Sequence, residues 1–325
     1  MAESSPLLVV EDLKTHFFTR RGVTKAVDGV GFTLDAGETL ALVGESGSGK
    51  SVTCLSLVRM VPEPAGRIIG GRVLFEGEDL LRKSPGEMRR VRGKQIAMVL
   101  QDPMTSLNPA LTIGTQVGEV VRLHQGLRGT PLRERVLEAL SRLRIPAADT
   151  RLGHYQHQLS GGMRQRVSSA IGMSCAPRLL IADEPTTALD VTIQAQYLEL
   201  LKEVQGSTGV AVILVTHDFG IVAANADRVA VMYAGKIVEM GTTLQVFDHP
   251  AHPYTQALLR CLPGVELKRQ LVEIGGQPPD LARLPPGCPF APRCPKRQPI
   301  CHETYPPSVT LENGHVAQCW VASVA

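Results

Sequence analysis

The stretch Gly44-Glu45-Ser46-Gly47-Ser48-Gly49-Lys50-Ser51 fits the phosphate-loop pattern, in which a glycine and four residues precede Gly-Lys-Ser or Gly-Lys-Thr. The apolar run 39–43 before it predicts a strand, and the segment 51–58 after it predicts a helix. Glycines let the backbone wrap closely round a phosphate, and the loop amides and helix N-terminus favour an anion. We therefore expect Lys50 to reach the β- and γ-phosphates of a nucleotide and Ser51 to hold Mg²⁺. A glycine-rich turn without a ligand is the weaker alternative, because every fixed position of the pattern is present.

The bulk composition limits the class of protein. The chain has 325 residues, of which 43% are apolar, so it can form one large domain or a domain with an appendage. No apolar run approaches the roughly 18–20 residues of a membrane span, and residues 1–5 lack the layout of a signal peptide. We expect a cytosolic protein. The net charge of +3, from 34 basic and 31 acidic residues, is too balanced to indicate nucleic-acid binding.

A second candidate site follows the apolar run 179–182, which predicts a fully buried parallel strand. Its carboxyl end carries Asp183 and Glu184, where open α/β sheets bind ligands. We expect Asp183 to organise Mg²⁺ and Glu184 to orient an attacking water or accept its proton. His217 ends the strand predicted at 211–215, and a neutral imidazole there could bond the γ-phosphate or that water. A purely structural histidine is the alternative.

The other segments predict a strand-rich start at residues 7–43 and a β-hairpin at 228–240. Phe17 and Phe18 fall in a polar segment that predicts a loop; one of them could stack on a nucleotide base, and ordinary packing is equally open. The basic run from Arg82 to Lys94 predicts a solvated surface loop rather than contact with RNA or lipid, because no aromatic residues interleave with it.

A helical insertion is predicted after Gln101, where the strand pattern stops. Residues 113–145 have helical periodicity. Ser160 is the expected N-cap of a further helix from Met163 onward. Exposed amides at such a helix start make a second anion-binding site.

The segment beyond Val246 is dense in prolines, so it should be loop-rich, bury little apolar surface and need a staple. Cys288, Cys294, Cys301 and Cys319 crowd its last forty residues. In a cytosolic chain such a cluster indicates a metal site more often than disulfides. The residues alone indicate four thiolate ligands and leave the metal open. Structural zinc sites usually have cysteines two to four residues apart, whereas the gaps here are five, six and seventeen residues.

These elements, in this order, resemble the motif set of ATP-binding cassette (ABC) ATPases over about residues 7–245. On this resemblance, Phe17 matches the base-stacking aromatic residue and Gln101 the glutamine that joins the catalytic core to the helical subdomain. The run 159–163 matches the family signature, and His217 the switch histidine. Asp190 lies in the dimer-contact loop, where Thr187 stands in place of the usual serine.

The resemblance implies a fold of the α/β class: a P-loop NTPase core with a mixed sheet, an antiparallel β subdomain and a helical subdomain. It implies an ATPase domain at 1–245, with the helical subdomain at about 103–172, and a small Pro/Cys-rich extension at 246–325. The implied ATP-binding residues are Phe17, Gly44, Glu45, Ser46, Gly47, Ser48, Gly49, Lys50, Ser51, Gln101, Asp183, Glu184 and His217.

The family also implies roles for these residues and a dimer. The implied catalytic residues are Glu184, His217 and Gln101, and the implied Mg²⁺ ligands are Ser51, Gln101 and Asp183. Each ATP lies between the phosphate loop of one subunit and the signature of a second. The residues expected to serve the partner's ATP are Ser160, Gly161, Gly162 and Gln165, and Asp190 is the expected dimer contact.

A narrower resemblance, to the ATPase subunits of bacterial di- and oligopeptide importers, covers the runs 101–109, 162–167 and 252–255 and the cysteine-rich tail. It implies a [4Fe–4S] cluster on the four cysteines, with zinc as the alternative. It also implies a second ATPase subunit, more often a paralogue than an identical copy, two transmembrane permeases, and a periplasmic or lipoprotein solute-binding protein. The expected location is the cytoplasmic face of the inner membrane. An importer for nickel or glutathione-like solutes is one alternative, and a soluble ABC ATPase without a transport role is another.

Overall fold

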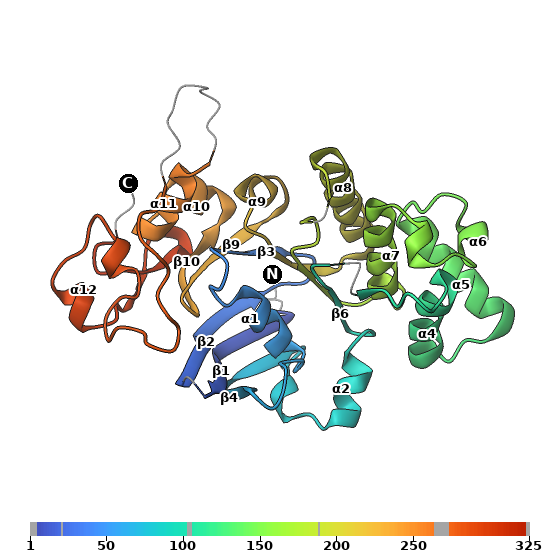
Figure 1. Cartoon of the computed structure of the whole chain (residues 1–325), viewed down its shortest axis with the longest axis horizontal. Helices are drawn as coiled ribbons and strands as arrows, with labels where there is room; N and C mark the ends of the chain where they lie inside the picture. The colour runs from blue at the N-terminus through green and yellow to red at the C-terminus, as the bar shows by residue number, and fades with distance from the viewer. Residues whose placement is uncertain (1–4, 21, 103–105, 188, 263–272, 323–325) are drawn as a thin grey trace. The chain divides into compact units, whose positions relative to one another are not determined.

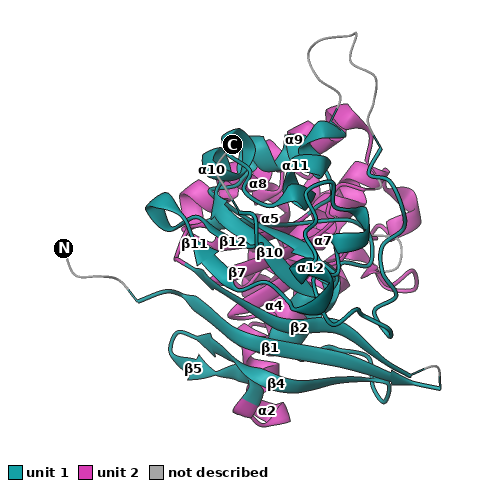
Figure 2. Ribbon diagram, turned by 90° about the vertical axis from the view of Figure 1, so that its left-hand side faces the viewer, with its two compact units in different colours: residues 1–34, 39–81, 216–325 teal, residues 35–38, 82–215 magenta. Residues whose placement is uncertain are grey.

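The computed structural model describes residues 5–20, 22–102, 106–187, 189–262 and 273–322 of the chain (Figure 1). The chain forms two compact units. Unit 1 comprises residues 1–34, 39–81 and 216–325, and unit 2 comprises residues 35–38 and 82–215; Figure 2 colours them teal and magenta. The residues that follow the predicted domain boundary at 245 thus belong to the same unit as the phosphate loop. The boundary itself stays a prediction.

Unit 1 begins with an antiparallel sheet in the order β2-β1-β4-β5. Its strands are β1 (Leu8–Thr19), β2 (Gly22–Leu34), β4 (Gly66–Phe75) and β5 (Glu78–Asp79). The strand-rich start is therefore confirmed. The loop predicted around Phe17 and Phe18 is wrong, because β1 continues through both residues and pairs with β2 and β4. Phe17 is half-buried and Phe18 is exposed.

Unit 1 also contains strands of a mixed sheet, in the order β11-β12-β10-β9-β3. β3 (Thr39–Val43) and β9 (Arg228–Tyr233) are parallel, and β10 (Lys236–Thr242) returns antiparallel to β9, which confirms the predicted hairpin. β3 is buried along its whole length, as its continuous apolar sequence predicts. The helices of unit 1 are α1 (Lys50–Leu57), α9 (Phe219–Asn225), α10 (Thr243–Asp248), α11 (Pro253–Arg260) and α12 (Ile300–Glu303).

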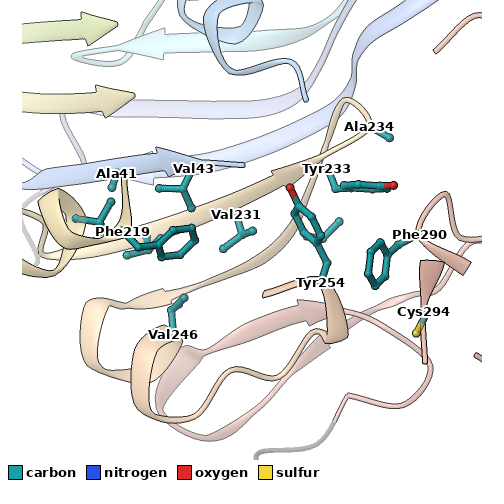
Figure 3. Close-up of a cluster of buried hydrophobic side chains, with 13 residues drawn as sticks. Ala41, Val43, Phe219, Val231, Tyr233, Ala234, Val246, Tyr254, Phe290 and Cys294 are labelled. Atoms are coloured by element: carbon teal, nitrogen blue, oxygen red, sulfur yellow. The ribbon is translucent and has the colours of Figure 1, made fainter. Parts of the chain in front are cut away.

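The C-terminal extension packs into this sheet and its core. β12 (Val316–Gln318) pairs antiparallel with β10, and β11 (Ser308–Thr310) pairs with β12. Tyr254 and Phe290 are buried in one cluster with Val43 and Val231 of the sheet (Figure 3). The prediction that the extension buries little apolar surface is therefore wrong at these positions.

Elsewhere in the chain and in the extension, short 3₁₀ turns occur at Leu80–Arg82, Gln156–Gln158, Ala291–Arg293 and Glu312–Gly314.

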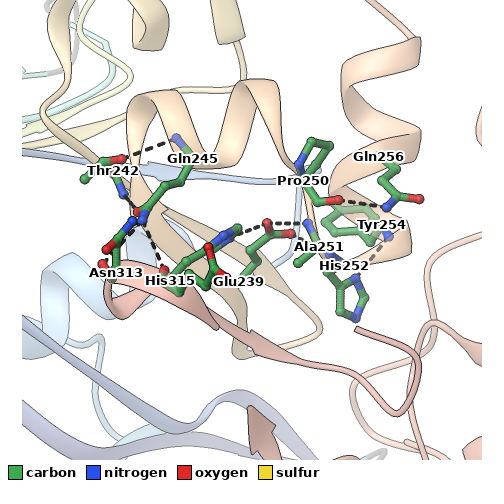
Figure 4. A network of polar contacts seen from close by, with 11 residues as sticks. Glu239, Thr242, Gln245, Pro250, Ala251, His252, Tyr254, Gln256, Asn313 and His315 are labelled. Atoms are coloured by element: carbon green, nitrogen blue, oxygen red, sulfur yellow. Dashed lines mark hydrogen bonds and ion pairs between the residues drawn. The ribbon is translucent and has the colours of Figure 1, made fainter. Parts of the chain in front are cut away.

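A buried carboxylate joins the extension to β10. Glu239, which is 1% exposed, accepts hydrogen bonds from the backbone N–H groups of Ala251 and His252, both at 2.8 Å (Figure 4). Its Oε1 also lies 2.8 Å from Nε2 of His315, which is buried beside β12. Burial lowers the pKa of His252 to about 4, so this imidazole is neutral and its Nδ1 accepts a hydrogen bond from the Tyr254 N–H at 3.0 Å. One carboxylate thus holds both the start and the end of the extension.

The described residues of unit 2 include three parallel strands in the order β8-β7-β6. They are β6 (Ile96–Val99), β7 (Leu179–Asp183) and β8 (Ala211–Val215), and the two buried strands expected near Asp183 and His217 are confirmed. The helices are α2 (Pro85–Val91), α4 (Ile113–Gln125), α5 (Gly129–Arg142), α6 (Ala148–Arg151), α7 (Gly161–Met173) and α8 (Val191–Thr208). Among the described residues, no helix has the length and apolar character needed to cross a membrane.

One prediction for unit 2 is confirmed and another is wrong. The helical periodicity at 113–145 corresponds to α4 and α5, and α4 ends at Gly126, which adopts φ +70° and donates its N–H to Arg122 O. The basic run expected as a loop contains α2, which begins with a capping box: Ser84 Oγ accepts from Glu87 N–H, and Glu87 Oε2 accepts from Ser84 N–H. Residues 103–105 and Ala188 of the predicted motifs lie outside the described residues.

Candidate functional site

The phosphate loop lies in unit 1 between β3 and α1, as its sequence predicts. Gly44 adopts φ +150° and Gly49 φ +108°, conformations that other residues rarely take. A Cβ atom on Gly44 would overlap the carbonyl oxygen of Met232, and one on Gly49 would overlap that of Ala26. Both glycines are therefore required by the close approach of neighbouring backbone as well as by their own conformation.

The Lys50 side chain connects the end of the loop to its first two residues. Its Nζ donates to the carbonyl oxygens of Gly44 at 2.7 Å and Glu45 at 3.0 Å. The Ser48 N–H also donates to Glu45 O at 3.2 Å, while the buried Ser48 Oγ has no hydrogen-bond partner within the described residues. Ser51 is half-buried in the first turn of α1. The loop therefore curls round an ammonium group and a hydroxyl, which are the donors that a phosphate needs.

The carboxylate site lies in unit 2, at the end of β7. Asp183 is buried and pairs in register with Val215 of β8. Glu184 follows with φ +44°, an uncommon conformation for a residue with a side chain and one that clusters at active sites. Its Oε2 accepts hydrogen bonds from Gln101 Nε2 at 3.0 Å and from Thr187 Oγ1 at 3.1 Å. The structure thus brings Gln101 and Glu184, two of the expected catalytic residues, within hydrogen-bond distance, and Thr187 donates a second hydrogen bond to the same carboxylate oxygen.

The signature residues begin α7 of unit 2. Ser160 is its N-cap, as predicted, and accepts a hydrogen bond from Met163 N–H, although the helix starts at Gly161. Ser160 and Gly161 are exposed, and Gly162 is half-buried. Gln165 differs from them, because it is 1% exposed and its Nε2 has no hydrogen-bond partner in the described part of the chain. The start of α7 is therefore exposed at Ser160 and Gly161, whereas Gln165, which is also expected to serve the partner's ATP, is buried.

Three further predicted residues lie on strands or loops. Phe17 lies near the end of β1, where its ring packs against Gly66. His217 is exposed between β8 and α9. Asp190 is the N-cap of α8 and accepts a hydrogen bond from Ile193 N–H at 3.0 Å. Roles for these residues in base stacking, water positioning and dimer contact stay predictions.

The four clustered cysteines line a single cavity of unit 1, together with His252, Phe290 and Trp320. Burial raises the pKa of the Cys288 thiol to about 11, and it also raises the pKa values of Cys294 and Cys319. Among the described residues, no group of three or more His, Cys, Asp or Glu side chains is close enough to hold a metal ion. The predicted cluster therefore stays a prediction.

Comparisons with known proteins agree with these motifs. The family model described as ABC transporter matches residues 27–187, and the one described as oligopeptide/dipeptide transporter, C-terminal region, matches residues 238–301. The dipeptide transport ATP-binding protein DppD of Bacillus subtilis is 51% identical over 316 residues, which cover 97% of this chain and 94% of that protein. The oligopeptide transport ATP-binding protein OppD of the same organism is 48% identical over 323 residues, with 99% and 90% coverage.

Solved structures show the same fold for the ATPase core. A dimeric post-hydrolysis state of the ATP-binding cassette MJ0796, bound to ADP and Pi, superposes with a TM-score of 0.64 at 25% identity and covers 73% of this chain and 98% of that one. The protein cbiO1 from Clostridium perfringens, part of an ABC transporter complex, gives a TM-score of 0.64 at 29% identity, with 75% and 91% coverage. On motifs, fold and relatives, the chain belongs to the ABC transporter ATPase family.

Proposed function

We propose that this chain is the ATP-hydrolysing subunit of an importer for dipeptides or oligopeptides. The observation that carries the proposal is the similarity to DppD and OppD, which extends over nearly the whole chain and includes the C-terminal region. The intact set of Lys50, Asp183 and Glu184 supports active hydrolysis rather than a regulatory role.

In the proposed mechanism, Lys50 would bind the phosphates, and the Ser51 hydroxyl and the Asp183 carboxylate would hold Mg²⁺. Glu184 orients the attacking water and accepts its proton. The hydrogen bonds from Gln101 and Thr187 to one carboxylate oxygen fix the orientation of Glu184. His217 is proposed to bond the γ-phosphate or the same water.

The proposed assembly contains a second ATPase subunit, for which a paralogue is the first choice. The exposed N-terminus of α7, with Ser160 and Gly161, would bind the γ-phosphate of the ATP held by that partner. ATP would then join the two subunits, and hydrolysis would release them. We also propose that the complex contains two permeases and a solute-binding protein. The chain would lie at the cytoplasmic face of the inner membrane.

Reconstitution tests this function. The chain is assembled with its permeases and partner ATPase in vesicles, with Mg-ATP inside and the solute-binding protein outside. Labelled di- or oligopeptide should accumulate only with ATP, and the loaded binding protein should stimulate turnover. ATP turnover that ignores both permeases and peptide would contradict the proposal. Accumulation of nickel or glutathione but not peptide would replace the substrate and keep the importer class.

We further propose that Cys288, Cys294, Cys301 and Cys319 hold a [4Fe–4S] cluster, with zinc as the alternative. The cysteines line one cavity whose other walls include Phe290 and Trp320, and the support for the proposal is this shared cavity with soft sulfur donors, although the thiols are not drawn together round one ion. When bound, the cluster would supply four bonds to thiolate and so cross-link the proline-rich segment. We propose a structural role for it.

Metal analysis tests the cluster. Protein purified without oxygen should contain iron and acid-labile sulfide, about four of each per chain. Cys301→Ser should lower both and make the extension more sensitive to protease, whereas Cys261→Ser, outside the cluster, should change neither. One zinc per chain without sulfide would rule the cluster out in favour of zinc.

A further inference from the structure

An ion pair connects the C-terminal extension directly to the phosphate loop. Arg293, which immediately precedes Cys294, binds Glu45 with both arms of its guanidinium: Nη1 lies 2.7 Å from Oε2, and Nη2 lies 2.8 Å from Oε1. The Arg293 side chain is 5% exposed and that of Glu45 is 25% exposed. Bidentate pairs of this kind fix both distance and orientation, so the geometry constrains the second residue of the loop.

The guanidinium is itself held in place by groups other than Glu45. Its Nε donates to Gly275 O at 3.0 Å, Nη2 donates to Ile274 O at 3.3 Å, and Nη1 donates to the Tyr233 hydroxyl at 3.3 Å. Its central carbon lies 5.9 Å from the ring centres of Tyr233 and Phe290. Arg293 is therefore positioned by the extension and β9, and it transmits that position to the loop.

The backbone of Glu45 is held as well. Its N–H donates to the hydroxyl of the fully buried Tyr254 on α11 at 2.9 Å, and its carbonyl oxygen accepts from Lys50 Nζ at 3.0 Å. A short chain of contacts thus runs from the extension through Glu45 to the ammonium group of Lys50. The extension also lies beside the following loop residues, since Pro278 and Pro279 line a small cavity with Ser46–Ser48.

The position of Arg293 depends in turn on the cysteine segment. The Arg293 N–H donates to Phe290 O at 2.9 Å, the Cys294 N–H donates to Ala291 O at 3.2 Å, and the Cys288 N–H donates to Cys301 O at 2.7 Å. The side chain therefore projects from a tight turn bounded by two of the cysteines. A change in that turn would move the guanidinium.

We propose that Arg293 is a positioning residue of the ATP site, which fixes Glu45 and thereby holds the phosphate loop in its binding conformation. This inference rests on the proposed function of the loop. A loop with three glycines loses much conformational entropy when it becomes ordered. Ordering it before ATP arrives reduces the cost of binding. Through Arg293, the cysteine-rich extension thus sets the affinity for ATP.

Glu45→Gln, Arg293→Met and the double variant test this in the full-length chain. Each single substitution should weaken Mg-ATP binding about tenfold, which is about 1.4 kcal/mol. The double variant should bind Mg-ATP no more weakly than either single variant, because both single substitutions remove the same Arg293–Glu45 ion pair. Binding is measured by titration with a fluorescent ATP analogue, and hydrogen exchange of the amides at 45–50 without nucleotide should accelerate. Arg72→Met, which breaks an exposed pair with Glu11 on the antiparallel sheet, should leave both unchanged.

The outcomes distinguish a failure of the proposed role of Arg293 from a failure of the proposed ATP-binding function. If the wild type binds ATP through Lys50, as judged by loss of binding in Lys50→Ala, an unchanged affinity in Glu45→Gln overturns the inference alone. Additive losses in the double variant also overturn it, because Arg293 would then not act through Glu45. If the wild type does not bind ATP, the proposed function fails instead. Should Arg293→Met not fold, the isosteric Glu45→Gln carries the test.

Discussion

Replacing Glu184 with glutamine is expected to lower ATP turnover by a factor of about 10² to 10⁴ and to leave ATP binding nearly unchanged. Glutamine keeps the size of the side chain and offers a carbonyl oxygen to Gln101 and Thr187. In the wild type these two residues donate to the Glu184 carboxylate at 3.0 and 3.1 Å. It cannot accept a proton from water. Single-turnover hydrolysis by the assembled transporter measures the loss, and gel filtration with ATP should show the two ATPase subunits held together.

Two control variants define what the loss means. Thr187→Val keeps the shape but removes one donor to Glu184, so turnover should fall by less than about tenfold. Glu203→Gln changes an exposed glutamate of α8 that pairs with Arg144, and it should have no effect. Turnover that is unchanged in Glu184→Gln would refute the role of Glu184. Loss of ATP binding together with turnover would indicate a structural role instead.

Local sequence was sufficient for the phosphate loop and the elements beside it. The buried strand β3, the loop and α1 are adjacent in the chain, and each has a strong local pattern. The same holds for β7 and β8, whose continuous apolar runs fit strands buried on both faces. Ser160 was found as an N-cap because its side chain acts within one turn of its own helix.

The strand at Phe17 and Phe18 and the start of α2 differ from the sequence-based prediction, for two different reasons. Phe17 and Phe18 belong to a strand because β1 has partners in β2 and β4, which the polar segment itself does not reveal. The start of α2 is a different case: the pattern Ser84-Pro85-Gly86-Glu87 is a capping box and could have been found in the sequence. Gly126 also marks the end of α4 by a local signal.

Contacts between distant positions could not be predicted from local pattern. Gln101 and Glu184 are 83 residues apart, and only the family resemblance related them before the structure showed their hydrogen bond. Arg293 and Glu45 are 248 residues apart, and neither has a sequence signal that indicates its partner. β11 and β12 have three residues each, too few to show a period of two. The packing of the extension is therefore information that only the tertiary structure supplies.

Replacing Glu239 with alanine is expected to destabilise the extension by about 3–5 kcal/mol, because it leaves several buried hydrogen-bonding groups without their partner. The change leaves the N–H groups of Ala251 and His252 without their acceptor and removes the partner of His315 Nε2. Trp320, the single tryptophan of the chain, lies in the extension, so its fluorescence reports this region during urea unfolding. The transition should shift to lower urea.

The network predicts a graded response to the substitution at position 239. Glu239→Gln keeps one oxygen acceptor but presents an amide N–H₂ where a second acceptor is needed, so its loss should be smaller, about 1–3 kcal/mol. Glu303→Ala removes an exposed carboxylate from α12 and should stay within about 0.5 kcal/mol of the wild type. In Glu239→Ala, the urea midpoint followed by far-UV circular dichroism, which reports the whole chain, should shift less than the midpoint followed by Trp320 fluorescence. The reason is that the carboxylate joins residues 251, 252 and 315 to β10. Equal midpoints in Glu239→Ala and Glu303→Ala would show that strand pairing and the apolar cluster around Tyr254 and Phe290 hold the extension without this carboxylate.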